Sequence, residues 1–348
     1  NNISTLLISP GAINVFRANK DFQDALLAEG IHIYMPTTQE WNRNEQQQLK
    51  EVSIEDLLPR DEISIDMESV GSMLHGKRIL ITGSAGSIGS EMVRQIAKYS
   101  PAELILIDSA ETPQHDIRLM MAKQFPDIKA ETIVTTICSK SRMEHIFKTY
   151  LPDYVFHAAA YKHVPMMENN PCESIQNNVY GTKILADLAV KYGVKKFVMI
   201  STDKAVNPTN VMGCSKRICE IYVQSLNKAI EEGIINGKTQ FVTTRFGNVL
   251  GSNGSVIPLF KKQIKAGGPV TVTDPRIIRY FMLIPETCKL VLEAGTKGNG
   301  GEIFVFDMGK PVKIADMAQR MINLSGAKNV EIKYTGLRAG EKLYEEVL

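Results

Sequence analysis

The sequence has 348 residues, of which 44% are hydrophobic and 22% charged, as in an ordinary globular protein. Lysine and arginine (40) nearly balance aspartate and glutamate (38), so no overall charge favours nucleic acid or an anionic membrane as a partner. The five cysteines are scattered and form no CxxC pair, which argues for a reducing compartment and against a disulfide framework or a zinc site. No apolar run reaches the roughly 20 residues that span a bilayer, and no signal peptide is visible.

The first 75 residues predict a partial α/β segment. Short apolar runs indicate strands, and apolar residues at helical spacing indicate helices. The strands are expected at 5–9 and 31–35, and the helices at 16–28 and 54–58, the last preceded by a polar stretch at 39–48. A piece this small seldom holds a core alone, so we expect it to pack on the main domain or to be the remnant of a second domain.

From residue 76 to residue 250, strands rich in Ile, Val and Leu alternate with amphipathic helices. Apolar strands separated by helices predict an α/β protein with a parallel sheet covered on both faces, the doubly wound Rossmann fold. The expected strands are 78–82, 104–107, 132–137, 154–157, 197–201 and 241–245. Residues 251–348 contain more loops, and there we expect two short strands, a helix at 314–324 and the smaller substrate-binding region.

A glycine-rich turn follows the first of these strands and opens a helix. Gly83 permits a tight turn, Gly86 lets the backbone approach a pyrophosphate, and Gly89 lets helix and strand pack closely. The helix start, with Ser87 and Ile88, offers free N–H groups and a positive dipole end to phosphates. The sequence therefore predicts a dinucleotide site, and its GxxGxxG spacing resembles that of the short-chain dehydrogenase/reductase superfamily.

The next strand ends in Asp108, about 20 residues further on, where a carboxylate holds the adenosine ribose hydroxyls in this type of site. A carboxylate there repels a 2′-phosphate and no Arg follows it directly, so NAD is favoured over NADP as the cofactor. No carboxylate follows the third strand, and contact with the adenine is expected from Thr136 or the backbone. The alternative for Asp108 alone is an ordinary turn residue at a strand end.

Two further strand ends carry candidate residues for the reaction centre. The small residues Ala158-Ala159-Ala160 follow the fourth strand and let the chain pass against the cofactor ribose. The fifth strand ends in the run Thr202-Asp203-Lys204. Because ligands bind beyond the carboxyl ends of the strands in such sheets, we expect these side chains beside the nicotinamide. The alternative for the adjacent charges is a solvated pair in a loop.

A helix expected after the fifth strand carries Met212 and Lys216, which share one helix face because they are four residues apart. This is the Tyr-x-x-x-Lys site of the superfamily with Met in the Tyr place. With five further segments, it closely resembles the UDP-N-acetylglucosamine 4,6-dehydratases of the large, membrane-anchored polysaccharide-biosynthesis type. Those segments are 157–165, 198–204, 245–249, 274–282 and 336–344. The resemblance runs from about Leu74 to Leu348, and the first 75 residues are similar to the cytoplasmic linker of those proteins.

The resemblance implies an NAD-dependent lyase that oxidises a UDP-sugar at C4, removes water across C5 and C6 and returns the hydride to C6. It implies that Asp203 is the acid for the departing hydroxyl and Lys204 the base at C5. Lys204 must lose its proton to act, which requires burial and nearby cations such as Lys216. Lys216 is implied to hold the nicotinamide ribose. The catalytic region is implied to be cytoplasmic, in a full-length protein that is anchored to the membrane.

Met212 has no proton to transfer, so the O4 proton must leave by another route. The alternatives are Thr202, Asp203 or an ordered water, with Lys216 nearby. A second interpretation of Met212 is core packing that shapes the pocket without taking part in the chemistry. Family members with Met in this place are associated with retention of configuration at C5, so the resemblance implies a C5-retaining enzyme.

Cationic and hydrogen-bonding side chains in the matched segments are the candidates for binding the UDP-sugar. Arginine offers paired donors to phosphate oxygens, and an amide or a carboxylate suits the sugar and the uridine. The candidates are Lys162, His163, Arg245, Asn248, Arg279, Arg338 and Glu341. No third ligand is suitably spaced to complete a metal site with His157 and His163, so no metal is expected.

Two other functions stay open. A nucleotide-sugar epimerase would use the same oxidation at C4, but it needs no base at C5 and no acid at C6. A dinucleotide-binding sensor without turnover would explain the missing tyrosine, but it has no use for Asp203, Lys204 and Lys216. Enzymes of this fold usually pair through helices of the dinucleotide domain, so we expect a homo-oligomer.

Overall fold

The computed structural model describes residues 4–36, 49–57, 65–346 and 348, so the predicted polar stretch at 39–48 lies outside the described residues. The chain forms two compact units. Unit 1 combines residues 1–63, 254–281 and 309–337, and unit 2 combines residues 64–253, 282–308 and 338–348. The chain therefore passes between the units several times, whereas the sequence predicted three consecutive segments, 1–75, 76–250 and 251–348. The functional roles given to those segments stay predictions.

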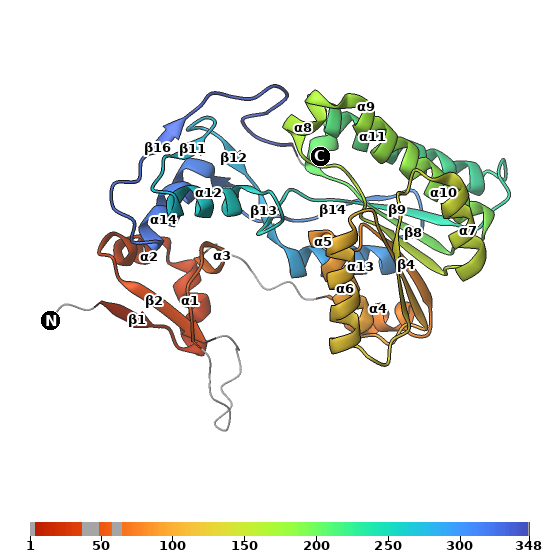
Figure 1. Cartoon of the computed structure of the whole chain (residues 1–348), viewed down its shortest axis with the longest axis horizontal. Coiled ribbons are helices and arrows are strands. Elements are labelled where there is room, and N and C mark those ends of the chain that lie inside the picture. Colours follow the sequence, from red (N-terminus) through yellow and green to blue (C-terminus); the bar gives the residue numbers. More distant parts are fainter. Residues whose placement is uncertain (1–3, 37–48, 58–64, 347) are drawn as a thin grey trace. The chain divides into compact units, whose positions relative to one another are not determined.

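Unit 2 is built on a seven-stranded parallel sheet with the strand order β14-β9-β8-β7-β4-β5-β6 (Figure 1). The strands are β4 (Arg78–Thr82), β5 (Glu103–Asp108), β6 (Ala130–Val134), β7 (Tyr154–His157), β8 (Lys196–Ile200), β9 (Gln240–Arg245) and β14 (Ile303–Val305). The order reverses between β4 and β7, as it does in doubly wound sheets. This confirms the predicted α/β class and Rossmann fold. It also places the switch point, where ligands bind in such sheets, at the carboxyl ends of β4 and β7.

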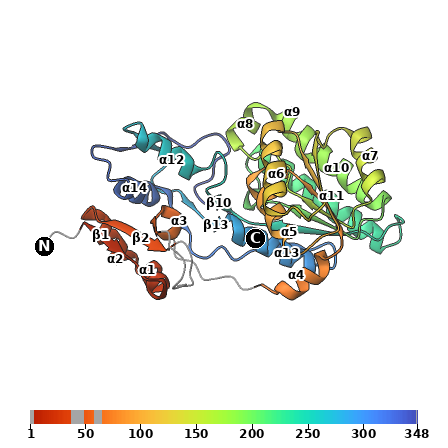
Figure 2. The ribbon, with the colours of Figure 1, turned by 60° about the horizontal axis from the view of Figure 1, so that its bottom comes forward.

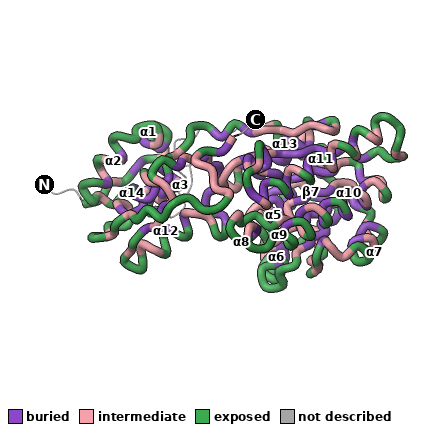
Figure 3. The backbone as a smooth tube through the Cα atoms, turned by 90° about the horizontal axis from the view of Figure 1, so that it is seen from above, coloured by how far each residue is buried: buried purple, intermediate pink, exposed green. Residues whose placement is uncertain are grey.

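Helices cover both faces of this sheet (Figure 2): α4, α5 and α13 pack together, and α10 packs against α7 and α11. The helical segments are α4 (Met67–Leu74), α5 (Ser87–Ala97), α6 (Glu111–Gln124), α7 (Lys140–Tyr150), α8 (Val164–Asn169), α9 (Pro171–Ser174), the π-helical η2 (Ile175–Tyr180), α10 (Gly181–Lys191), the 3₁₀-helical η3 (Asp203–Ala205), α11 (Val211–Glu231) and α13 (Ile284–Lys297). The five inner strands β4, β5, β7, β8 and β9 are consequently mostly buried (Figure 3), whereas the edge strands β6 and β14 are not. In β4 the side chains of Ile79, Leu80 and Ile81 are fully buried. Each such side chain contributes about 1.5–3 kcal/mol of hydrophobic stabilisation.

The region beyond residue 250 contains more regular structure than the sequence predicted. The helix expected at 314–324 is confirmed as α14 (Ile314–Leu324). Strand β10 (Asn248–Leu250) comes directly before this region. Besides α13 and β14, the region also contains α12 (Val256–Lys265), β11 (Val270–Val272), β12 (Ile278–Arg279), β13 (Phe281–Leu283), β15 (Val312–Lys313) and β16 (Ile332–Tyr334). The prediction of two strands was wrong because strands of two or three residues are too short to show an alternating pattern. Strand β14 also forms one edge of the sheet of unit 2, and helix α13 packs on that sheet. The sequence predicted that this sheet would end near residue 250.

The first part of unit 1 is a small α/β layer that packs on the later part of the chain. It contains β1 (Thr5–Leu7), η1 (Pro10–Ala12), α1 (Ile13–Ala18), α2 (Lys20–Ala28), β2 (His32–Pro36), β3 (Leu49–Glu51) and α3 (Ile54–Leu57). Buried Ile8, Phe16 and Leu27 belong to a core to which Leu324 of α14 contributes. Arg320 of α14 forms an ion pair with Asp24, with 2.8 Å between Arg320 Nε and Asp24 Oδ1. The segment thus shares a core with α14, which belongs to the same unit.

Two predicted boundaries in the chain were wrong for local reasons. The single helix expected at 16–28 is broken at Asn19, whose side chain accepts a hydrogen bond from the backbone N–H of Phe22 (3.1 Å) and starts a new helix. The strand expected at 132–137 ends at Val134, and the chain then turns as Thr136 Oγ1 accepts from the N–H of Cys138 (3.2 Å). Within the described ranges, no helix combines the length and apolar content needed to cross a bilayer.

Candidate active site

The glycine turn after β4 packs backbone against backbone. Gly83 has φ +66°, in the left-handed region that favours glycine. A Cβ on Gly83 would lie 2.7 Å from the backbone nitrogen of Ala159, which belongs to the loop after β7. A Cβ on Gly89 would lie 1.9 Å from the carbonyl oxygen of Gly83, so α5 starts in direct contact with the turn. The turn therefore has no room for a side chain at Gly83 or Gly89, which is the close backbone packing that a dinucleotide site requires.

We expect Gly89→Ala to lower the free energy of unfolding by about 1–3 kcal/mol or more, because the added methyl overlaps backbone that cannot move aside. Denaturant unfolding measures this loss. Gly86→Ala is the matched control, since its Cβ would lie 3.3 Å from the same carbonyl oxygen and needs only a small shift. Equal losses in the two variants would contradict the packing described for Gly89.

Asp108 at the end of β5 braces the same turn. One of its carboxylate oxygens accepts from the N–H of Ala85 (3.0 Å), and the other accepts from the N–H of Ala110 (2.9 Å). A carboxylate has about four lone-pair positions, so capacity remains for the ribose hydroxyls. Ser87 Oγ, at the start of α5, accepts from the N–H of Asn253 (3.0 Å). The predicted cofactor contacts of Asp108, Ser87 and the exposed Thr136 stay predictions.

His157 at the end of β7 is a structural link. Its two ring nitrogens are hydrogen-bonded to Thr82 Oγ1 (2.7 Å) and Thr182 Oγ1 (2.8 Å), and its side chain is buried. Burial, together with the charge of Lys216, lowers the pKa of His157 to about 3, so the imidazole is neutral at physiological pH. Thr82 also accepts from the N–H of Ala159 (3.3 Å). His157 thereby fixes the small-residue loop against β4 and α10.

Buried Asn178, in the π-helical segment η2, holds the rest of that loop. It exchanges hydrogen bonds with the backbone of Tyr161 (2.8 and 2.9 Å) and donates to Ser215 of α11 (2.9 Å). Single turns of π-helix are frequent at functional sites. These hydrogen bonds of Asn178 hold the loop in which the predicted substrate residues Lys162 and His163 lie, and both residues are exposed.

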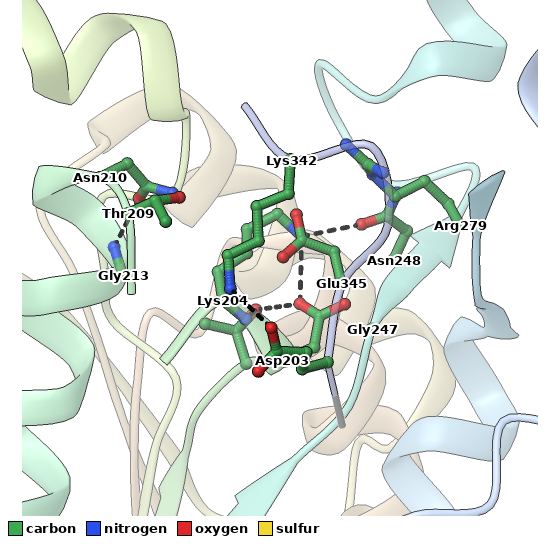
Figure 4. Close-up of polar contacts among 12 residues, drawn as sticks. Asp203, Lys204, Thr209, Asn210, Gly213, Gly247, Asn248, Arg279, Lys342 and Glu345 are labelled. Carbon is green, nitrogen blue, oxygen red and sulfur yellow. Dashed lines mark hydrogen bonds and ion pairs between the residues drawn. The ribbon is translucent and has the colours of Figure 1, made fainter. Parts of the chain in front are cut away.

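The predicted acid and base lie in direct contact (Figure 4). Lys204 Nζ donates to Asp203 Oδ1 (3.0 Å) and to Asn248 Oδ1 (3.2 Å), and it lies 3.7 Å from Glu345 Oε1. The hydroxyl of Thr202 donates to the same Asp203 oxygen (2.8 Å). The structure therefore brings together Thr202, Asp203, Lys204 and Asn248, and it adds a second carboxylate, Glu345.

The other carboxylate oxygen of Asp203, Oδ2, is buried and has no hydrogen-bond partner among the described residues. The Asp203 side chain is only 1% exposed. An unsatisfied buried oxygen is costly in a native protein and calls for an explanation such as a bound ligand. The arrangement excludes the alternative of a solvated loop pair, because both charges are held within the fold.

Arg245, predicted to bind the diphosphate, is instead paired with buried Glu220. Its Nε and Nη2 donate to the two Glu220 oxygens (2.8 and 2.6 Å), which also accept from Ser201 (2.6 Å) and Arg217 (2.9 Å). Burial raises the pKa of Glu220, but the hydrogen bonds from Arg245, Ser201 and Arg217 lower it below its ordinary value. Because the Arg245 fork is occupied by this pair, Arg245 links the end of β9 to α11, and its contact with the diphosphate stays a prediction.

We expect Arg245→Met to lower the free energy of unfolding by about 3–5 kcal/mol at neutral pH, because it leaves the Glu220 carboxylate buried without its main partner. The loss should shrink as the pH falls, because the unpaired buried Glu220 of the variant takes up a proton, whereas wild type keeps the pairing down to the lowered pKa of Glu220. Thermal or denaturant unfolding from pH 7 to pH 4 measures both effects. A pH-independent loss would contradict this account.

Helix α11 carries Met212 and Lys216, which are 3% and 5% exposed. Burial lowers the pKa of Lys216, and Cys219 and Glu220 offset this only in part. In the described part of the chain, Lys216 Nζ has no hydrogen-bond or ion-pair partner. A Cβ on Gly213 would lie 2.2 Å from the carbonyl oxygen of Lys204, so α11 packs directly on the acid–base segment.

The three remaining candidates, Arg279, Arg338 and Glu341, have local contacts of their own. Arg279 belongs to unit 1, where it is buried and donates to the carbonyl of Ile278 (2.8 Å). Arg338 and Glu341 close a turn in which the Arg338 N–H donates to Glu341 Oε2 (3.1 Å). Their contacts with a nucleotide stay predictions. Searched over the residues that the structure describes, no group of three or more His, Cys, Asp or Glu side chains is placed to hold a metal ion.

Sequence reasoning missed Glu345, Asn178, Glu220 and Gly213. Their contacts with Lys204, Tyr161 and Arg245 join different elements of the fold, and no local pattern marks such pairs. Asn210 is different, because its side chain caps α11 by accepting from the N–H of Gly213 (2.7 Å). An Asn just before a helical pattern is a recognisable start signal.

Known proteins resemble this chain over most of its length. The sequence profile of the family described as polysaccharide biosynthesis protein matches residues 79–348. The capsular polysaccharide biosynthesis protein CapD of Staphylococcus aureus is 50% identical over 92% of this chain and 53% of its own length. A UDP-N-acetylglucosamine 4,6-dehydratase (inverting) of Campylobacter jejuni is 37% identical over 78% of each chain. A UDP-glucose 4-epimerase of Rickettsia canadensis is 35% identical over 79% of each chain.

The chain spans about half the length of the S. aureus relative. The dehydratase and the epimerase are almost equally similar to it, so identity alone does not separate these two activities. The side chains of the site must do so. Because the family profile covers most of the sequence and a relative is 50% identical across 92% of it, the chain belongs to the polysaccharide biosynthesis protein family.

Proposed function

We propose that this chain catalyses the NAD-dependent 4,6-dehydration of a UDP-N-acetylhexosamine, UDP-N-acetylglucosamine, to the 4-keto-6-deoxy sugar for a surface polysaccharide or glycan. The observation that carries the proposal is the buried pair of Asp203 and Lys204, with one Asp203 oxygen lacking a partner among the described residues. An elimination across C5 and C6 needs an acid and a base side by side. The dehydratase name of the C. jejuni relative supports the substrate class.

The glycine turn fits a dinucleotide, because Cβ atoms on Gly83 and Gly89 would collide with the backbone that forms the cradle. The cradle and the first turn of α5, with Gly86, Ser87 and Ile88, would hold the pyrophosphate. When bound, the dinucleotide would accept a hydride from C4 and return it to C6. The adenosine and nicotinamide riboses would be held by Asp108, Thr136, Ala158, Ala159, Ala160 and Lys216. The charge of Asp108 disfavours a 2′-phosphate, which supports NAD over NADP.

The ion pair can supply both the base and the acid. Transfer of a proton from Lys204 Nζ to Asp203 across the 3.0 Å hydrogen bond leaves a neutral amine and a neutral acid without changing their total charge. The amine then takes the C5 proton, which the C4 ketone has made acidic, and the electrons of the C5–H bond form a C5=C6 double bond. The C6–O bond breaks as the hydroxyl takes the proton of Asp203 and leaves as water. At the end of the cycle, Lys204 returns its proton to C5.

The O4 proton must leave during oxidation at C4, and Met212 cannot accept it. We assign the removal of the O4 proton to the hydroxyl of Thr202, which is hydrogen-bonded to Asp203. Thr202 passes this proton on to solvent. The Asp203–Lys204 pair later takes one proton back from solvent, so the protons balance over the cycle. We expect Thr202→Val to lower kcat about 100-fold and Met212→Tyr to restore turnover in that background. Steady-state rates measure both. Full activity of Thr202→Val would show that the O4 proton leaves by another route.

The substrate contacts are proposed from the matched segments. Arg279 and Arg338 would bind the diphosphate, because guanidinium groups pair with phosphate oxygens. Asn248 and Glu341 would contact the sugar or the uridine, and the exposed Lys162 and His163 would border the sugar. For the configuration at C5 we propose retention, on the strength of Met212, although the C. jejuni relative is named as inverting. Proton couplings in the reduced product, measured by NMR, decide between the two configurations.

The second candidate is a nucleotide-sugar epimerase, which the Rickettsia relative favours. The Asp203–Lys204 pair favours the dehydratase, because a 4-epimerase has no use for a base at C5 or an acid at C6. Incubation with UDP-N-acetylglucosamine and NAD, followed by mass spectrometry, separates them. We expect a product lighter by one water; an isomer of unchanged mass would establish the epimerase, and no product with several UDP-sugars would favour a sensor.

We further propose a homo-oligomer, which the exposed Ile218 and Ile221 on α11 support. Light scattering of the protein tests this. A cytoplasmic location and a membrane anchor in the full-length protein remain proposals that rest on the resemblance alone.

A further inference from the structure

The C-terminal segment, residues 338–346, returns to the loop that carries the acid–base pair. The Gly340 carbonyl accepts from Thr209 Oγ1 (3.1 Å) and from Asn210 Nδ2 (3.2 Å), and Lys342 Nζ donates to the carbonyl of Val206 (3.2 Å). Gly340 has φ +74°, and a Cβ on it would lie 2.6 Å from Asn210 Cβ. The segment therefore docks closely on the residues that follow Lys204, with glycine at the point of nearest approach.

This docking brings a third charged group to the pair. Glu345 Oε1 lies 3.7 Å from Lys204 Nζ, and the side chains of Glu345 and Asp203 are 5% and 1% exposed (Figure 4). Two buried carboxylates thus face one ammonium. At such short range and low exposure, a charge on one group acts strongly on its neighbour. Glu346, next in the chain, points elsewhere and contacts Asn207 and Lys342.

We propose that Glu345 is a positioning residue for the base: it orients Lys204 and stabilises the ammonium that forms when Lys204 takes the C5 proton. This inference rests on the proposed dehydration. As the C5–H bond breaks and its electrons enter the C5=C6 double bond, the proton moves to Lys204 Nζ. Asp203 still holds its own proton until the C6–O bond breaks and water leaves. Of the two carboxylates that contact Lys204, Glu345 is the one that keeps its negative charge throughout this step.

The role of Glu345 is therefore specific to one step of the reaction. Oxidation at C4 places no charge on Lys204, whereas removal of the C5 proton does. Removing the Glu345 charge should slow the second step and leave the first unchanged. A purely structural role in docking the segment would disturb both steps, because the loop of residues 202–210 carries groups for each of them.

Glu345→Gln tests this, with Glu346→Gln as the matched control on the neighbouring residue. The wild-type chain and each variant are mixed with UDP-N-acetylglucosamine and NAD, and two signals are followed: the near-ultraviolet absorbance of reduced nicotinamide and the dehydrated product. For Glu345→Gln we expect product formation about 10- to 100-fold slower, oxidation at C4 at the wild-type rate, and hence accumulation of reduced nicotinamide. We expect Glu346→Gln to keep both rates. Glu345→Asp, which retains the charge, should recover part of the lost rate.

Three results would overturn the inference. Wild-type product formation by Glu345→Gln would show that the charge does not act. If Glu345→Gln and Glu346→Gln both slow oxidation at C4 and removal of the C5 proton to the same extent, Glu345 serves only to dock the segment 338–346. If wild type forms no dehydrated product, both the proposed function and this inference fail. If wild type forms the product and Glu345→Gln removes the C5 proton at the wild-type rate, only the inference fails. Thermal unfolding of each variant separates loss of fold from loss of the step.

Discussion

Lys204→Met should lower the rate of dehydration by about 10²- to 10⁴-fold while oxidation at C4 continues, so that reduced nicotinamide accumulates. The reason is that the methionine fills the space of the lysine stem but cannot take the C5 proton. Asp203 and Glu345, both buried, lose their common cation in this variant. We therefore also expect a loss of stability, moderated by protonation of one carboxylate.

Lys183→Met is the control for this variant, because Lys183 is paired with Asp187 on α10 and belongs to no part of the site. It should keep wild-type dehydration. Substantial dehydration by a folded Lys204→Met protein would contradict the assignment of the base. Loss of C4 oxidation together with dehydration would mean that Lys204 acts earlier in the cycle than we propose.

Lys216→Met should lower the rate of oxidation at C4 by about 10²- to 10⁴-fold. It should leave the protein at least as stable as wild type. Lys216 is 5% exposed, and in the described part of the chain its ammonium has no hydrogen-bond or ion-pair partner, so the fold bears the cost of burying that charge. We propose that Lys216 is kept at this position because it contacts a bound nicotinamide ribose and the reacting O4. Gain of stability with loss of function is the pattern expected of a residue kept for chemistry.

The pH dependence of stability gives an independent reading of Lys216. Its pKa in the fold lies below the ordinary value of 10.5, so the unfolded chain binds the proton more tightly than the native protein does. Wild type should therefore gain stability relative to Lys216→Met as the pH rises toward 10.5. Unfolding titrations of both proteins at increasing pH measure the difference. A Lys216→Met protein clearly less stable than wild type at neutral pH would contradict the unpaired burial of the amine.

Local patterns in the sequence predicted the parts of the fold that local chemistry determines. The strand at 78–82, the helix at 314–324 and the glycine turn between β4 and α5 all follow from apolar periodicity and from glycines at fixed spacing. The break at Asn19 was missed because a helical period of apolar residues runs through it, while the cap depends on one side chain. Helix α13 and strand β14 were missed because the loops around them obscured the pattern.

The candidate site divides in the same way. Thr202, Asp203 and Lys204 are adjacent in sequence, so their proximity was predictable once the strand end was placed. Asn248 was expected to face the substrate, and its contact with Lys204 joins residues 44 positions apart. Glu345 comes from the far end of the chain and has no signal of its own near the acid–base run. The pairing of Arg245 with Glu220 is equally non-local, so no pattern near Arg245 could have revealed it.

The measurement that tests the central claim most directly follows two labels in one turnover. Wild-type protein is incubated in heavy water with NAD and UDP-N-acetylglucosamine that carries deuterium at C4, and the product is examined by mass spectrometry and NMR. The account predicts a product that has lost water, carries the C4 deuterium at C6 and has solvent deuterium at C5. Deuterium that returns to C4 in a sugar of undiminished mass, with no solvent label at C5, would contradict it.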